Sequence, residues 1–475
     1  MMGQYEGEKF GRSLDLDSKS EEMRVETGVT AAIIRRARSL ASGTLPPKVR
    51  LIAKHCLVDW CGVALAGTDE PLVRILTEML LAEGCKPAAS VVGNQLKFSL
   101  RQAALLNGAT GHAIDYDDVN MAASAHITAA ILPATLAASE MAGSSGDGLL
   151  RAFIGGYEAT VMIGRFLGRE HYDRGFHATA TAGTCGAAAA SALALGLDTH
   201  EMAVAIGIAA TQAAGLKAQF GTMCKPFHAG KSNENGLSGT LLARRGFTGR
   251  TDILECVQGF ADTHGGAGNA EAALAAPRSF AHICDNLFKY SAACYGTHGA
   301  ILAAGQLRRE HSLTPDIIGR VELDVEPGAD RMCNIEVPLT GLESKFSLRF
   351  NTALAFANED TSSPALYCDA ITRRQDLSDL RSRVVVNCMP PGWPNTLTEV
   401  RVQTTDGRWL KARHDTGIPE EDLAQQAARV RHKFLGLSTP VLGSSHASAL
   451  HTMIENIDRQ ESLEPLFALL RGEWR

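Results

Sequence analysis

The segment GHAIDYDDVNMAASAH, residues 111–126, gathers ionisable side chains in an otherwise Ala-rich stretch of the chain. Asp115, Asp117 and Asp118 fall within four positions, and a histidine stands near each end. Such a cluster could bind a divalent cation, occupy a helix terminus, orient a histidine or bind a substrate hydroxyl. A metal site would need carboxylates on adjacent helical turns and a second acidic cluster, which the sequence does not offer. We therefore expect no metal, and we expect a carboxylate of this cluster to orient a histidine or bind a substrate hydroxyl, with a structural helix terminus as the alternative.

Three further segments combine histidine, lysine or cysteine with Gly, Ser and Thr, a composition typical of loops and helix starts that present side chains to a pocket. They are RGFHATATAGTCG (174–186), FGTMCKPFHAGKSNENG (220–236) and LFKYSAACYGTH (287–298). Any single histidine among the fifteen is more often structural than catalytic. The candidates in these segments are His177, Lys225, His228, Lys231, Lys289, Cys294 and His298.

Lys225, His228 and Lys231 together would form a cradle for carboxylates. The plainer alternative is an exposed basic loop, but Pro226 and Gly230 indicate a fixed conformation. The segment that holds Lys289, Cys294 and His298 lies where the helical pattern gives way to strands. Clefts form at such junctions, so we expect these side chains to contact a substrate.

Several functional classes are excluded by the sequence. The formal net charge of −6 is spread without basic or acidic blocks, so we expect neither nucleic acid nor a membrane surface as a partner. The glycine-rich HGGAGNA follows no strand, and no phosphate-binding loop is present, so we expect no cofactor. The eleven cysteines form no C-x-x-C pair, and no apolar signal segment precedes them. Both features favour reduced thiols and a cytoplasmic location.

The elements that would position these residues are mostly helices. Apolar residues repeat with helical spacing from Thr44, with Lys48 and Asp59 on the polar face. The stretches 184–197 and 201–216 are apolar on nearly all sides and predict buried helices, and Asp198 with Glu201 predicts a capped helix start. We expect Ala-rich helices to continue to about residue 285.

After that point the periodicity changes to that of strands. RVELDVE (320–326) alternates, RVVVN (383–387) is β-branched, and EVRVQTTDGRWLKAR (399–413) predicts a hairpin with its turn at Asp406-Gly407. A helix is expected near residues 345–358, and helices return towards the C-terminus. The fold class is therefore mainly α, with a discontinuous all-helical domain and an inserted α/β lid. The expected domains are a disordered leader (1–26), a helical part (27–286), the lid (287–421) and a second helical part (422–475).

The four segments, in this order, resemble the MmgE/PrpD family, which includes 2-methylcitrate dehydratase, cis-aconitate decarboxylase and iminodisuccinate epimerase. The matching stretches are NGATGHAIDYDD, GFHATATAGTCGAAAA, FGTMCKPFHAGKSNENG, RRGFTGRTDILE and FKYSAACYGTH. The resemblance covers the chain from about residue 29 to its end. It implies a helical domain with an inserted α/β lid, and a homodimer.

The resemblance also implies which residues line the pocket. The family's catalytic positions fall on Asp115, His126, His177, Lys225 and Lys289. The decarboxylase branch has a threonine where this chain has Val119, a histidine at Cys294 and a tyrosine near Met332 or Cys333. These departures weigh against a cis-aconitate decarboxylase.

We therefore expect a metal-independent lyase, similar to 2-methylcitrate dehydratase, that removes an α-proton from a small di- or tricarboxylate. His126 or His177 would act as base and acid, with Asp115 orienting one of them, and Lys225 and Lys289 would hold substrate carboxylates. The alternatives are an epimerase of aspartate- or succinate-type dicarboxylates and a cis-aconitate-type decarboxylase. Two alternatives belong to other functional classes: a binding or scaffold module that kept the fold and lost the activity, and a metal-dependent helical synthase.

Overall fold

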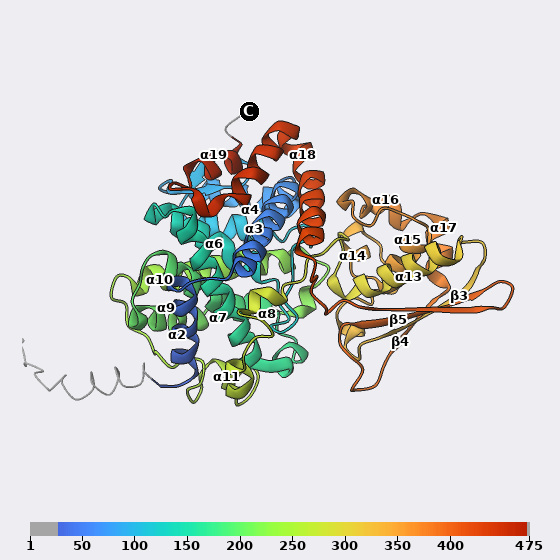
Figure 1. Cartoon of the computed structure of the whole chain (residues 1–475), viewed down its shortest axis with the longest axis horizontal. Helices are drawn as coiled ribbons and strands as arrows, with labels where there is room; N and C mark the ends of the chain where they lie inside the picture. The colour runs from blue at the N-terminus through green and yellow to red at the C-terminus, as the bar shows by residue number, and fades with distance from the viewer. Residues whose placement is uncertain (1–26, 473–475) are drawn as a thin grey trace, which may run out of the picture.

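The computed structural model describes residues 27–472, and the expected leader at 1–26 lies outside this range (Figure 1). The chain is mainly helical, with a small mixed sheet. The first helices and the hairpin between them are α2 (Val29–Ser42), α3 (Pro47–Gly67), α4 (Pro71–Glu83), β1 (Ala89–Val91), β2 (Asn94–Phe98), α5 (Leu100–Thr110), α6 (Ile127–Ala142), α7 (Gly146–Asp173), α8 (Ala178–Ala194), α9 (Thr199–Ala210) and α10 (Cys224–Ala243).

The other elements up to residue 415 are mostly short helices and the four strands of a second sheet. They are η1 (Lys217–Gln219), α11 (Phe260–His264), α12 (Ala270–Leu274), η2 (His282–Asp285), η3 (Tyr295–Thr297), α13 (His298–His311), β3 (Ile318–Val325), η4 (Ala329–Arg331), α14 (Gly341–Ser344), α15 (Leu348–Phe356), η5 (Pro364–Leu366), α16 (Asp369–Thr372), α17 (Gln375–Ser382), β4 (Val384–Cys388), β5 (Leu397–Thr404) and β6 (Trp409–Asp415). The chain ends in α18 (Leu423–Glu455), η6 (Ile457–Arg459) and α19 (Glu464–Arg471).

The Ala-rich helix α8 lies at the centre of the helical body, which we define as α2 to α12 together with α18 and α19 (Figure 1). It packs against α6, α7, α9 and α10. Small residues permit this close packing, because a Cβ atom added at Gly236 of α10 would lie 2.5 Å from that of Ala187. The two buried helices expected from the sequence are confirmed, as is the capping box of Asp198 and Glu201.

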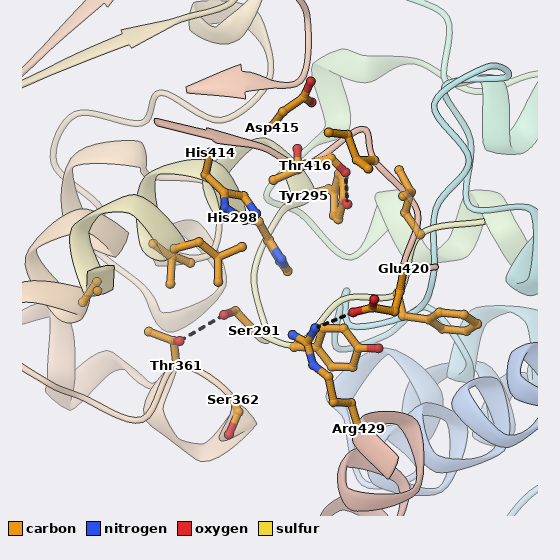
Figure 2. Close-up of a pocket in the computed structure, with 18 of the residues that line it drawn as sticks. Ser291, Tyr295, His298, Thr361, Ser362, His414, Asp415, Thr416, Glu420 and Arg429 are labelled. Atoms are coloured by element: carbon orange, nitrogen blue, oxygen red, sulfur yellow. Dashed lines mark hydrogen bonds and ion pairs between the residues drawn. The ribbon is translucent and has the colours of Figure 1, made fainter. Parts of the chain in front are cut away.

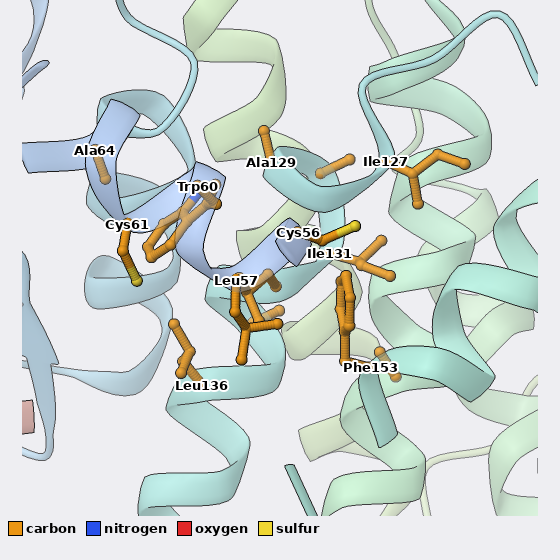
Figure 3. Packing of buried hydrophobic residues seen from close by; sticks show 14 of the residues in the cluster. Cys56, Leu57, Trp60, Cys61, Ala64, Ile127, Ala129, Ile131, Leu136 and Phe153 are labelled. Atoms are coloured by element: carbon orange, nitrogen blue, oxygen red, sulfur yellow. The ribbon is translucent and has the colours of Figure 1, made fainter. Parts of the chain in front are cut away.

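The N-terminal core packs α3 against α6 and α7. Leu57, Trp60, Ile131 and Phe153 interdigitate there (Figure 3). The prediction that Asp59 lies on a polar outer face of this helix is wrong. Asp59 is buried and pairs with Lys433 of α18 at 2.6 Å, because α18 covers the face of α3 that the sequence pattern left for solvent.

The strands β3 to β6 form one sheet in the order β4-β3-β5-β6, with β3 and β4 parallel and the other pairs antiparallel. Helices α13 and α15 pack on it around their own apolar core. We call residues 298–415 the sheet segment, which lies to one side of the helical body (Figure 1). The strands, the hairpin and the helix near 345–358 are confirmed. The domain boundaries stay a prediction.

Two expectations about the helical part are wrong. The hairpin β1–β2 interrupts it, because Gly93 adopts a positive φ of 73° and turns the chain between two short strands. The stretch 244–297 holds only short helices among long connections, because glycines recur along it. Within residues 27–472, none of the helices combines the length and the apolar character that crossing a membrane requires.

Candidate active site

A narrow cavity of about 70 Å³ lies between the helical body and the sheet segment. His126, His177 and Lys225 line it from the helical body. Its other walls include Cys294, Tyr295, Val325, Glu326, Met332 and Thr398. Four of the residues singled out from the sequence therefore reach one cavity: His126, His177, Lys225 and Cys294.

The helical body aims three helix N-termini at this cavity. His126 is the N-cap of α6, His177 is the N-cap of α8, and Lys225 lies in the first turn of α10. The backbone N–H groups at a helix start are unpaired and the helix dipole is positive there, so each terminus favours an anion. The cavity is therefore electrostatically suited to a carboxylate ligand.

Asp115 anchors the two lysines that the sequence singled out. Its Oδ1 accepts hydrogen bonds from Lys225 Nζ at 2.6 Å and from Lys289 Nζ at 2.9 Å. Lys289 is fully buried and is not among the residues that line the cavity, so its role in holding a substrate carboxylate stays a prediction. It lies behind Asp115 and compensates its charge, whereas Lys225 faces the cavity.

Three buried lysines hold the backbone of this segment. The carbonyl oxygens of Ile114, Asp115 and Tyr116 accept hydrogen bonds from Lys345 at 2.6 Å, Lys289 at 2.7 Å and Lys433 at 2.6 Å. Asp115 needs this support because its φ of 53° is in the left-handed region that side chains other than Gly seldom adopt. The carboxylate is thus fixed in place by residues from distant parts of the sequence.

Asp117 connects two histidines. Its Oδ1 lies 2.7 Å from His112 Nδ1 and its Oδ2 lies 3.3 Å from His126 Nδ1. The turn directs the side chain of Asp117 inward, where it contacts both imidazoles. Asp118 is also buried and accepts hydrogen bonds from Thr128 at 2.6 Å and Asn286 at 2.9 Å, a structural role.

The hydrogen bonds of His126 assign its tautomer. Nδ1 lies 2.9 Å from the backbone oxygen of Asp118, which can only accept, so Nδ1 carries the proton. Nε2 of the neutral ring is then free to accept a proton, and it lies 3.8 Å from Oδ1 of Asp115. Burial lowers the pKa of His126, and the lysines lower it further. His126 therefore rests neutral and can act as a base.

His177 is the second titratable group at the cavity. Its Nδ1 lies 3.1 Å from Nδ1 of His228, so one ring donates to the other. Burial, aided by Lys225, holds the pKa of His177 well below its usual range and lowers the pKa of His228 to about 4. Both rings are neutral at pH 7, and His228 acts on the cavity through His177.

Two of the three buried carboxylates in this segment, Asp115 and Asp117, stay charged. Burial alone would raise the pKa of Asp115, but Lys225 and Lys289 hold it well below its usual range. Burial likewise opposes ionisation of Asp117, whose pKa the adjacent histidines lower. Burial raises the pKa of Asp118 to about 7. The site thus separates two ionised carboxylates from one that titrates near neutrality.

Four side chains lie close enough together to hold a metal ion: His112, Asp115, Asp117 and His126. Two ammonium groups already donate to Asp115 Oδ1, and a divalent cation would have to overcome their repulsion. The donor set is therefore better matched to internal ion pairing than to a metal.

Two sequence candidates lie elsewhere. Lys231 is not among the residues that line the cavity and pairs with Glu234, so its part in a carboxylate cradle on α10 stays a prediction. His298 lines a larger cleft of about 890 Å³ (Figure 2). The hydrogen bond from Tyr295 Oη to the backbone oxygen of Thr416, at 2.6 Å, belongs to the wall between this cleft and the cavity.

Sequence reasoning missed four residues at or around the cavity: His112, Arg169, Glu326 and Lys345. His112 stands in the acidic segment and could have been found from its spacing to Asp117. Glu326 ends a recognisable strand. Nothing in the sequence near Arg169 or Lys345 signals a functional role.

Comparisons with known proteins agree with this arrangement. The model of the MmgE/PrpD N-terminal domain matches residues 32–273, and that of the MmgE/PrpD C-terminal domain matches residues 291–459. A cis-aconitate decarboxylase of Aspergillus terreus is 27% identical over an alignment of 493 residues, gaps included. The alignment covers 96% of this chain and 98% of that protein.

Two further relatives carry similar names. The human cis-aconitate decarboxylase is 26% identical over 464 residues, covering 94% of this chain and 95% of that protein. A cis-aconitate decarboxylase-like protein of Aspergillus oryzae is 30% identical over 302 residues, covering 60% of this chain and 63% of that protein. Since the two domain models together span most of its length, the chain belongs to the MmgE/PrpD family.

Proposed function

We propose that the chain is a metal-independent lyase that releases CO₂ from a small unsaturated tricarboxylate of the cis-aconitate type. The observation that carries this proposal is the cavity into which Lys225, His126 and His177 project from three helix N-termini. The nearly full-length similarity to cis-aconitate decarboxylases supports the choice of substrate.

The chemistry needs cations and one proton. In cis-aconitate the leaving carboxylate is on the CH₂ carbon beside the double bond. When that C–C bond breaks, its electron pair forms a new double bond, and the electrons of the old one move to the CH carbon next to another carboxylate. That carbon then takes a proton. Lys225 and the helix termini stabilise the charge that develops there.

His126 or His177 supplies the proton in this scheme. Both are neutral in the free site, but a substrate with three negative charges raises the pKa of a nearby imidazole and favours its protonation. Asp115 holds Lys225 in place, and Asp117 orients His126. No step requires a group that the described residues do not provide.

Dehydration of a 2-methylcitrate-type substrate is the second candidate. The neutral Nε2 of His126 favours it, because a dehydratase begins by taking a proton from carbon. The side chains of Val119, Cys294 and Met332 along the cavity also depart from the pattern expected of a decarboxylase. Both reactions share the same cationic cavity.

The sheet segment would act in either reaction as a lid, since it supplies Glu326, Met332 and Thr398 to a cavity whose histidines and Lys225 belong to the helical body. We also propose that the chain works as a homodimer in the cytoplasm. Light scattering coupled to gel filtration tests the dimer.

Nuclear magnetic resonance in D₂O tests the reaction. The purified protein is incubated with cis-aconitate, citrate, 2-methylcitrate and an N-substituted aspartate. Loss of cis-aconitate with formation of an unsaturated dicarboxylate carrying one deuteron supports the decarboxylase. Loss of water from 2-methylcitrate supports the dehydratase, and exchange at Cα without net loss supports an epimerase. No change in any substrate would contradict the proposal.

A further inference from the structure

An ion pair crosses the cavity between the helical body and the sheet segment. Arg169 Nη2 donates to Glu326 Oε2 at 3.1 Å, and both residues line the cavity. Arg169 follows the break in α7 at Gly168, whose φ is 69°, and Glu326 directly follows β3. The two ends of this pair are therefore fixed on separate parts of the fold.

The side chain of Glu326 is buried among charged and polar groups. Its carboxylate is 6% exposed, and burial raises its pKa although Arg169 opposes this. The other titratable or charged groups that act on it are Asp173 and Tyr172 of α7, Lys217 of η1 and Cys333 beyond η4. Lys217 is engaged elsewhere, because its Nζ lies 3.5 Å from the centre of the Tyr172 ring and donates to the Tyr172 carbonyl.

The charge balance of the cavity is incomplete for a tricarboxylate. Lys225 and Lys289 are both committed to Asp115, which leaves one net positive charge from these three groups. Arg169 is a further cation on the wall, but Glu326 and the more exposed Asp173 neutralise it. A ligand with three carboxylates would find a free partner there only if Glu326 moved away.

We propose that Glu326 occupies the position of a substrate carboxylate: when a tricarboxylate binds, one of its carboxylates replaces Glu326 on Arg169, and Glu326 takes up a proton from solvent. This inference rests on the proposed function, because it assumes that the cavity binds polycarboxylates. Arg169 forms two parallel hydrogen bonds to a carboxylate readily, so the exchange conserves its bonding. A carboxylate left buried without its cation favours the protonated form.

The exchange makes Arg169 a residue that determines specificity. A dicarboxylate whose two carboxylates bind Lys225 and the helix N-termini at His126 and His177 has none left to displace Glu326, so it leaves the ion pair closed. The pair thus selects tricarboxylates over dicarboxylates of the same length.

Calorimetric titration tests this with two probes that differ by one carboxylate, tricarballylate and glutarate, neither of which has the double bond needed to lose CO₂. Titrations at pH 7 in two buffers of different ionisation enthalpy give the number of protons taken up. For the wild type we expect uptake with tricarballylate that exceeds the uptake of Glu326→Gln by nearly one proton. We also expect Glu326→Gln to bind tricarballylate about 10-fold more tightly, since no charged competitor remains on Arg169.

The matched control is Glu322→Gln, which removes a carboxylate from the same strand where it pairs with Arg320 and Arg401 outside the cavity. This variant should behave as the wild type does. Arg169→Gln should reduce the preference for tricarballylate over glutarate by about 10-fold. Circular dichroism melting curves identify any variant that fails to fold.

Equal proton uptake by the wild type and Glu326→Gln would overturn the inference, and so would an unchanged preference in Arg169→Gln. Proton-coupled binding of tricarballylate without turnover of any substrate would overturn the proposed function but support the exchange. Turnover of cis-aconitate without a difference between the variants would support the proposed function but overturn the exchange. Failure of both probes to bind would contradict both.

Discussion

Lys289 donates from one buried ammonium to two oxygens of Asp115, the backbone carbonyl at 2.7 Å and Oδ1 at 2.9 Å. The same Oδ1 accepts from Lys225, which faces the cavity. Asp115 therefore connects a fully buried lysine, Lys289, with Lys225, which lines the cavity. Its left-handed backbone conformation is held by contacts that only the folded chain provides.

Replacing Asp115 should affect stability and activity together. Asp115→Asn leaves two buried ammonium groups without their anion, so we expect a loss of about 3–5 kcal/mol of unfolding free energy. We also expect kcat/KM to fall at least about 10²-fold, because Lys225 loses its position. Urea unfolding and steady-state kinetics measure the two effects. Asp376→Asn, at an exposed side chain, is the control, and an Asp115 variant as stable as this control would refute the role.

The buried pair of Asp59 and Lys433 makes a separate prediction about stability. Lys433 Nζ lies 2.6 Å from Asp59 Oδ1 and also donates to the carbonyl of Tyr116. Lys433→Met should lose about 3–5 kcal/mol because it leaves a buried carboxylate unpaired. The double variant with Asp59→Leu should recover part of this loss. Urea midpoints of the wild type and the two variants measure this recovery, and a double variant no more stable than Lys433→Met would contradict the coupling.

Stability should fall when the pH drops below 6.5. Burial lowers the pKa of several histidines to about 4 or below: His55, His112, His171, His228, His282 and His298. Between pH 6.5 and 4 the unfolded chain binds protons at these histidines that the folded chain excludes. Stability is therefore lost as the pH falls through this window.

Asp59 and Asp118 act in the opposite direction, since burial raises their pKa values to about 6 and 7. Burial also raises the pKa values of Glu158, Asp285 and Glu326, but these acids are outnumbered by the buried histidines, to which His126 and His177 add, so the net effect is destabilisation. We expect the urea midpoint to be clearly lower at pH 5 than at pH 7.5. A midpoint that stays constant or rises at pH 5 would show that the histidines are not buried as described.

Removal of divalent cations should not reduce activity. Lys225 and the helix N-termini supply the positive charge at the cavity, and Asp115 is already satisfied by ammonium groups. We expect kcat/KM after dialysis against EDTA to remain within about threefold of its value before treatment, a margin small against the 10² or more that loss of an essential group costs. Loss of activity that Mg²⁺ or Zn²⁺ restores would instead assign His112, Asp117 and His126 to a metal site.

The sequence predicted the elements with strong periodicity. The alternation of Val321, Leu323 and Val325 located β3, and the apolar surface of residues 184–192 located α8. Local pattern could not place Asp59, because its surroundings depend on α18, which lies far along the chain.

At the site, the sequence identified which residues gather around the cavity better than it identified what each of them does. Sequence reasoning placed Asp115, His126, His177 and Lys225 in the pocket, and the fold brings these four together. The role of Lys289 in holding a substrate carboxylate stays a prediction, and its depth behind Asp115 could be seen only in three dimensions. Arg169 and Glu326 meet across 157 positions, a contact that no local pattern encodes.

The proposed decarboxylation is tested by comparing two lysines of α10, of which only Lys225 lines the cavity. CO₂ release from cis-aconitate is measured for the wild type, Lys225→Met and Lys231→Met. We predict that Lys225→Met lowers kcat/KM by about 10²-fold or more and that Lys231→Met stays within about threefold of the wild type. Equal rates for Lys225→Met and the wild type, or no CO₂ release by the wild type, would contradict the account.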